Sequence, residues 1–212
     1  CYTDRAGSQP CCVDLGVSIY STAYPLDVMA LRSTVASLVR CEISTGGRLT
    51  FPLQLPRSVD EIRSVAGAHV DPAVRSAISI AEVAAPTGDE ARRAAFVASI
   101  LKSRGYTPEI DDIGNVYARR EGNRERGCLM LVAHTDTVFP AGTDVTVRRE
   151  GDAIFGPGVG DNSLGVAAMV EALAILDELQ LADVPEIIAV ASVGEEGLGN
   201  LRGVRAAVDR FR

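Results

Sequence analysis

The sequence predicts an α/β fold with a mostly parallel, mixed sheet and helices on both faces. Two kinds of segment support this prediction. Residues 127–134 and 186–193 are short and almost entirely apolar, as expected of strands that are covered on both faces of a sheet. Residues 71–85, 90–104 and 163–180 have the length and apolar content of helices. Buried strands that alternate with helices are typical of an α/β sheet.

The first two helices have recognisable ends. The first is expected to begin at Asp71, a favoured N-cap residue, with Pro72 in its first position, and to stop before Pro86. Thr87 and Glu90 then have the spacing of a capping box ahead of the second helix.

The remaining elements follow from turn residues and apolar patterns. Residues 107–120 predict two strands around a turn at Gly114 and Asn115. Residues 145–150 predict a further strand, and residues 198–211 predict a helix with some glycine interruption.

The chain divides into two unequal parts. Residues 1–65 mix polar, Cys and Pro residues without a repeating apolar face, and the first methionine is Met29. We expect this part to be a poorly structured N-terminal extension or a wrongly assigned start. Residues 66–212 carry the α/β pattern and form the second part.

The composition argues against several functions. A net charge of −7, without a long basic run, argues against nucleic acid or an anionic membrane as a partner. No apolar run approaches the roughly eighteen residues that cross a bilayer, and the start lacks the pattern of a signal peptide. The five cysteines contain no C-x-x-C pair, which argues against a thiolate zinc site. We therefore expect free thiols and a cytoplasmic location.

Polar clusters follow the apolar strands and the glycine-rich loop. His134 and Asp136 come directly after the first buried strand, Asp161 follows three glycines in residues 156–160, and the pair Glu195 and Glu196 follows the second buried strand. In α/β sheets, ligands bind outside the carboxyl ends of the strands. Three acid-bearing segments at such positions predict a metal site.

Each cluster also has a simpler interpretation. His134 and Asp136 can point to the same side of an extended chain, so that the carboxylate orients a ligating imidazole, but they can equally form a polar strand cap. Asp161 can be a metal ligand or a helix N-cap. One of the two glutamates can bind a metal while the other accepts a proton, or both can lie in a solvated acidic turn.

The three clusters taken in order resemble one enzyme family. The motifs are VAHTDTV (132–138), GPGVGDNSLGVAAM (156–169) and GEEGLGNLRG (194–203), with APTGDE and GNVYAR upstream. Together they resemble the dizinc exopeptidase and amidohydrolase family, which includes carboxypeptidase G, peptidase T, acetylornithine deacetylase and succinyl-diaminopimelate desuccinylase. The resemblance runs from about residue 70 to residue 212 and implies a zinc-exopeptidase-like fold.

The resemblance implies a role for each residue. His134 would ligate one zinc and Asp136 would orient its imidazole, while Asp161 would bridge two zinc ions and Glu196 would ligate the second. Glu195 would be the general base that takes a proton from metal-activated water. A complete site would hold two Zn²⁺ ions, although Co²⁺ or Mn²⁺ suits the same ligands. The substrate would be a peptide or an N-acyl amino acid.

The chain departs from the family at two points. The family's remaining ligands, a further acid and a late histidine, have no counterpart, and His69 lies upstream of the matching region, where we expect it to be exposed. The family's lid domain, which helps to bind substrate and often mediates homodimer formation, would begin after residue 212. We therefore expect the first part of a catalytic domain, with an incomplete site and little or no activity alone. The alternatives are a non-catalytic α/β interaction module and a nucleotide-binding α/β domain.

Overall fold

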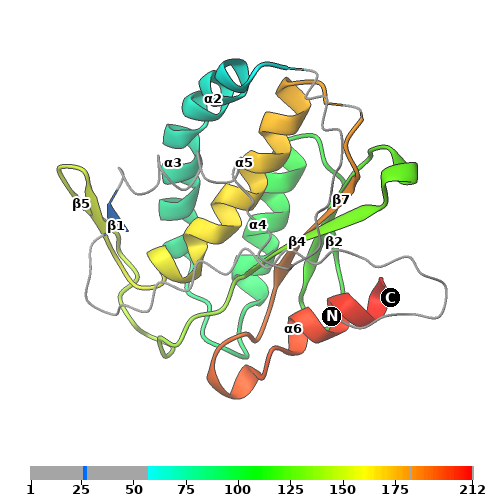
Figure 1. Cartoon of the computed structure of the whole chain (residues 1–212). Helices are drawn as coiled ribbons and strands as arrows, with labels where there is room; N and C mark the ends of the chain where they lie inside the picture. The colour runs from blue at the N-terminus through cyan, green and yellow to red at the C-terminus, as the bar shows by residue number, and fades with distance from the viewer. Residues whose placement is uncertain (1–25, 28–56, 182, 212) are drawn as a thin grey trace, which may run out of the picture.

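The computed structural model describes residues 26–27, 57–181 and 183–211 (Figure 1). The α-helices are α2 (Val59–Ala68), α3 (Val70–Ala81), α4 (Ala91–Ser103), α5 (Leu164–Glu178) and α6 (Arg202–Arg210). The strands are β1 (Leu26–Asp27), β2 (Glu109–Ile110), β3 (Val116–Arg120), β4 (Cys128–His134), β5 (Arg148–Glu150), β6 (Ala153–Phe155) and β7 (Glu186–Ser192). The short helical turns are η1 (Arg124–Arg126), η2 (Val159–Ser163) and η3 (Gly197–Gly199).

The main sheet has four strands in the order β2-β3-β7-β4. Strand β7 pairs in parallel with β4, whereas β3 pairs antiparallel with both β7 and β2. The predicted mixed α/β class is therefore confirmed, but the expectation of a mostly parallel sheet is wrong. Among the described strands of this sheet only β4 and β7 pair in parallel, because β3 enters between β2 and β7 in the antiparallel direction. Because His134 pairs with Ser192, these two strands reach the same edge of the sheet together.

Both faces of the sheet are covered, as predicted. Residues that alternate along β3 point to opposite sides: Val116 and Ala118 join the larger core cluster, whereas Tyr117 joins a smaller one. Helices α3, α4 and α5 pack on the larger cluster, and Ala207 of α6 belongs to the smaller one (Figure 1). The polar segments that leave β4 and β7 are thus carried by a sheet with a core on each side.

The predicted boundary at residue 65 falls inside a helix. Helix α2 begins because the Ser58 side chain accepts a hydrogen bond from the Glu61 N–H at 3.2 Å, and it is held by the buried Ile62 and Ala66. The α/β body therefore begins upstream of residue 66. Apart from residues 26–27 and 57–65, the predicted extension lies outside the described residues and stays a prediction.

The predicted N-cap at Asp71 is displaced, because α3 begins at Val70 directly after α2. The Ala73 N–H bonds to the His69 carbonyl at 2.9 Å, so the helical path continues from α2 with little interruption. A new side-chain cap is then unnecessary, and none forms at His69. Pro86 does lie beyond the end of this helix, as predicted.

The expectation of an exposed His69 is wrong. Its side chain is 12% exposed, and its two ring nitrogens lie 2.6 Å from Glu171 and 3.0 Å from Glu178, both on α5. Arg104, at the end of α4, also pairs with the buried Glu171. These contacts could not be predicted from local sequence patterns, because His69 and its partners are about a hundred residues apart. His69 thus links the junction of α2 and α3 to α5. The glutamates that its ring contacts are not those of the predicted metal site.

Helix α5, together with η2, is long and apolar enough to cross a membrane by length and composition alone. Here it packs against α3 and β4, and its Leu173 and Val170 are fully buried. It also carries the ion-paired Glu171. These contacts are those of the core helix of a globular domain.

The core prediction concerns Leu173. We expect Leu173→Ala to lower the free energy of unfolding by about 2–5 kcal/mol, because it removes buried methyl groups and leaves a cavity. Urea denaturation followed by circular dichroism measures this change. The matched control is Leu198→Ala, since Leu198 is fully exposed; its effect should stay within about 0.5 kcal/mol. Equal effects of the two substitutions would contradict the assigned core.

Candidate metal centre

The parallel strands β4 and β7 bring the polar segments that follow them to the same edge of the sheet. Main-chain pairing continues past the strand ends, because the Thr135 N–H donates to the Ser192 carbonyl at 2.7 Å. The segment that contains His134 and Asp136 therefore runs beside the segment that contains Glu195 and Glu196. This is the carboxyl edge of a parallel pair, where the sequence predicted a site.

His134 is in contact with three of the predicted acidic residues. Its Nε2 atom lies 2.9 Å from Oδ1 of Asp161 and 3.9 Å from Oε2 of Glu195. Its Nδ1 atom lies 3.1 Å from the main-chain oxygen of Asp136 and 3.6 Å from the carboxylate Oδ1 of the same residue. Nε2 thus faces the acidic groups, while Nδ1 is held by the segment that follows β4.

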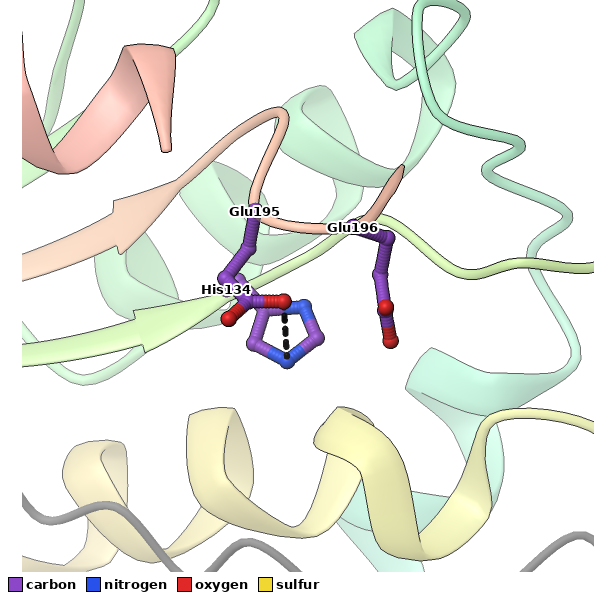
Figure 2. Close-up of side chains that lie close together, drawn as sticks. All are labelled: His134, Glu195 and Glu196. Atoms are coloured by element: carbon purple, nitrogen blue, oxygen red, sulfur yellow. Dashed lines mark ion pairs between the residues drawn. The ribbon is translucent and has the colours of Figure 1, made fainter. Parts of the chain in front are cut away.

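Three of these side chains offer atoms close enough to share an ion. One ligand atom each from His134, Glu195 and Glu196 lies within 4.8 Å of the other two. Figure 2 shows both glutamate side chains extending in the same direction from the loop after β7, with the His134 ring beside them. Asp161 adjoins this group through its contact with His134 Nε2. One imidazole nitrogen with several carboxylate oxygens is a donor set that suits Zn²⁺ and also Co²⁺ or Mn²⁺.

Asp136 makes contacts that the sequence did not reveal. Its carboxylate is fully buried and accepts three hydrogen bonds of 2.9 Å, from the main-chain N–H groups of Glu195 and Glu196 and from the hydroxyl of Thr87. The predicted role in orienting His134 stays a prediction, because the closest contact to that ring is through the main-chain oxygen. Asp136 fixes the turn that carries the two glutamates.

Thr87 and Glu90 do not form the predicted capping box. Thr87 donates to Asp136, and Glu90, which is buried, forms an ion pair with Arg202. Helix α4 consequently begins without a side-chain cap at Glu90. Both side chains have found charged partners, which form stronger hydrogen bonds than a neutral N–H does.

Asp161 is not the N-cap of α5. The N-cap residue is Ser163, and the Asn162 Oδ1 atom accepts a hydrogen bond from the Gly165 N–H at 3.1 Å. The Asp161 carboxylate is therefore available to His134. Gly158 has a φ of +67°, and a side chain there would come within 2.5 Å of Thr137. The glycine-rich segment thus lies against the exit of β4, which brings Asp161 to the centre.

Opposing charges shift the ionisation of the centre. Burial lowers the pKa of His134, but the carboxylates of Asp136 and Asp161 outweigh it and raise the pKa to about 10. Burial likewise opposes the ionised form of Asp136, yet its hydrogen bonds hold the pKa of that carboxyl well below its usual range. Burial first, and then the charge of Asp161, raises the pKa of Glu196. The acids are crowded enough to favour a bound cation.

A buried arginine, which was not among the residues predicted from the sequence, holds the main chain next to the centre. The Arg93 guanidinium donates to the main-chain oxygens of Val83, Thr135 and Ala81. Burial lowers the pKa of Arg93 to about 10 despite the nearby charge of Asp136. Thr135 lies between two predicted site residues, so Arg93 fixes their main chain. Its spacing of four residues from the buried Val97 was the available signal.

The chain is similar in sequence to known peptidases and hydrolases. A match to Peptidase family M28 covers residues 115–209. A Pyrococcus abyssi (strain GE5 / Orsay) protein assigned as a LysW-lysine/LysW-ornithine hydrolase is 32% identical over 127 residues, 60% of this chain and 34% of that protein. Carboxypeptidase G2 of Pseudomonas sp. (strain RS-16) is 29% identical over 109 residues, 50% of this chain and 25% of that protein. The matched part of the chain thus spans about a third or less of these relatives.

Solved structures share the fold. Human carnosine dipeptidase 1 superposes with a TM-score of 0.58 at 15% identity, over 71% of this chain and 37% of its own. A tripeptidase of Staphylococcus aureus subsp. aureus Mu50 superposes with a TM-score of 0.55 at 24% identity, over 65% of this chain and 40% of its own. These superpositions show that the chain has the fold of these peptidases.

More particularly, the relatives and solved structures that the chain matches include peptidases and amide hydrolases of the kind that its motifs resemble. The resemblance drawn from its three motifs is thereby confirmed.

The hydrogen bonds of Asp136 generate a prediction. Asp136→Ala leaves two buried N–H groups and a hydroxyl without their acceptor, while repulsion among the neighbouring acids is relieved. We expect the first effect to prevail and the free energy of unfolding of the metal-free chain to fall by about 2 kcal/mol. Chemical denaturation in a chelator-containing buffer measures this.

Asp144→Ala is the matched control for that measurement. Asp144 also accepts two hydrogen bonds, from the N–H and the hydroxyl of Thr146, but it is exposed. Its loss should cost less than about 0.5 kcal/mol. If Asp136→Ala were as harmless as the control, Asp136 would not fix the glutamate turn.

Proposed function

We propose that this chain forms the metal-binding part of a hydrolase that cleaves a peptide or other amide bond. The observation that carries the proposal is the convergence of His134, Glu195 and Glu196, whose ligand atoms lie within 4.8 Å of one another at the carboxyl edge of β4 and β7. Relationship to peptidases and amide hydrolases supports the same reaction class.

The ligands of the proposed site are His134, Asp161 and Glu196. Asp161 would lie between two ions, because its carboxylate has two oxygens and is half exposed while one of them already faces His134 Nε2. Asp136 would keep the imidazole and both glutamates in place through its hydrogen bonds. When bound, Zn²⁺ supplies Lewis-acid polarisation of the scissile carbonyl and makes water more acidic.

Glu195 is the proposed general base. Its carboxylate is 38% exposed and lies 3.9 Å from His134 Nε2, so it borders the ligand cluster and still faces solvent. A carboxylate in this position can accept a proton from the attacking water and then deliver it to the leaving amine. The main-chain hydrogen bond from its N–H to Asp136 keeps its position relative to His134 fixed.

The proposed class of substrate is based on the names of the relatives. Their names describe a carboxypeptidase and a hydrolase of lysine or ornithine derivatives, so we propose a peptide or an N-acyl amino acid as the substrate. A homodimer formed through a lid domain, the absence of nucleic acid and membrane partners, and a cytoplasmic location stay predictions. The nucleotide-binding alternative also stays a prediction; in the first turn of α5 the Gly165 N–H donates to Asn162 Oδ1.

Metal binding is the first test of the proposed site. A hundredfold excess of Zn²⁺ over its dissociation constant should raise the melting temperature by roughly 5–10 °C, because the ion binds the folded chain. Asp161→Ala should abolish this shift. His69→Ala is the control: it removes the other histidine, so it should lower the starting melting temperature yet keep the zinc-dependent rise. If His69→Ala lost the zinc-dependent rise in melting temperature and Asp161→Ala kept it, the metal would bind outside the proposed site.

Stoichiometry and turnover test the completeness of the site. We expect fewer than two tightly bound zinc ions per chain and little or no hydrolysis of dipeptides or N-acyl amino acids, because the family's remaining two ligands have no counterpart in this sequence. Elemental analysis after dialysis and an amine-release assay measure these quantities. Two tight zinc ions with rapid turnover would show that the chain is sufficient alone.

A further inference from the structure

We propose that the ion pair between Arg202 and Glu90 positions the loop that carries Glu195 and Glu196, and so sets the metal affinity of the centre. This inference rests on the proposed function, because it assigns a positioning role toward the same ion. Neither residue is a proposed ligand or proton carrier. Arg202 begins α6, whereas Glu90 immediately precedes α4.

The contact is short, and its carboxylate partner is buried. One guanidinium nitrogen of Arg202 lies 2.7 Å and 2.8 Å from the two carboxylate oxygens of Glu90. Glu90 is 5% exposed, and one of its oxygens also accepts a hydrogen bond from the Gly88 N–H at 2.9 Å. A charge-assisted contact of this kind is stronger than a neutral hydrogen bond, and the buried carboxylate of Glu90 has little access to water.

The Arg202 side chain also lies directly on the glutamate loop. A side chain placed on Gly194, whose φ is +62°, would come within 2.1 Å of the guanidinium. The Arg202 N–H donates to the Gly194 carbonyl at 3.2 Å, and the Gly203 N–H donates to the Val193 carbonyl at 2.9 Å. Gly194 immediately precedes Glu195, so the position of the guanidinium limits where the loop can begin.

The backbone just before Arg202 is strained. Asn200 and Leu201 have φ values of 53° and 56°, in the left-handed region that branched residues such as Leu201 rarely adopt. Such a conformation persists only where neighbouring contacts hold it. The contacts of Arg202 with Glu90 and with Gly194 directly follow these residues and can supply that restraint.

The glutamate loop is therefore held from two sides. Asp136 accepts the N–H groups of Glu195 and Glu196 at one side, and Arg202 packs on Gly194 at the other. The two supports are joined, because Thr87, which donates to Asp136, lies in the same short segment as Glu90. Loss of Arg202 would free one side of the loop without removing any ligand.

The sign of the effect separates positioning from simple electrostatics. Removing a positive charge near the acids should tighten cation binding if charge alone matters. Removing a positioning contact should instead weaken binding, by about tenfold or more, as the loss of outer contacts does at other metal sites. The two explanations therefore predict opposite changes for the same substitution.

The experiment is a Co²⁺ titration of the full 212-residue chain, followed by the visible absorption of the bound ion. Arg202→Gln should weaken Co²⁺ binding about tenfold or more and alter the intensity of the absorption bands, which reports the coordination geometry. Arg202→Lys, which keeps the charge, should recover part of the affinity. The melting temperature of each metal-free variant is recorded alongside.

Arg104→Gln is the matched control. Arg104 and Glu171 form an ion pair with side-chain exposures of 30% and 3%, close to the 36% and 5% of Arg202 and Glu90, but it joins the C-terminal end of α4 to the middle of α5. It should lower the melting temperature and leave Co²⁺ affinity and spectrum unchanged. Unchanged or tighter Co²⁺ binding by Arg202→Gln would overturn the positioning role alone. Failure of the parent chain to bind Co²⁺ would overturn the proposed function with it.

Discussion

The buried carboxylate of Asp136 is the contact on which the geometry of the centre depends. It joins the segment after β4, the loop after β7 and the segment before α4, since it accepts hydrogen bonds from Glu195, Glu196 and Thr87. These segments are far apart in the chain and meet because β4 and β7 are parallel and end together, with His134 opposite Ser192. Without an acceptor at this point, several buried donors would lack a partner, and the glutamates would lose their fixed relation to His134.

The cost of this arrangement is electrostatic, and the surroundings offset part of it. Asp136, Asp161, Glu195 and Glu196 lie around one imidazole, and the carboxylates of Asp136 and Asp161 outweigh the effect of burial and raise its pKa to about 10. The carboxylates of such a cluster repel one another, and a bound divalent cation would relieve this repulsion. A rigid framework keeps the acids together despite their repulsion, which is the arrangement that preorganised sites require.

Much of the fold could be predicted from local patterns. The apolar strands that became β4 and β7, the turn at Gly114 and the helix that became α5 all follow from residue type and spacing. The candidate site was predictable because its residues lie at strand exits and in three recognisable motifs. Long-range partners were not predictable: His69 was expected to be exposed yet bonds to Glu171, about a hundred residues away. Thr87 and Glu90 fit a local cap, but distant charged partners were more favourable.

The most direct test of the account is X-ray absorption spectroscopy at the zinc edge on the zinc-loaded chain. The account predicts a first shell at about 2.0–2.2 Å composed of one imidazole nitrogen with carboxylate and water oxygens, without sulfur. The imidazole contribution should disappear in His134→Ala and persist in His69→Ala. A shell that contains sulfur, or one that keeps its imidazole when His134 is removed, would contradict the convergence of these loops on a common ion.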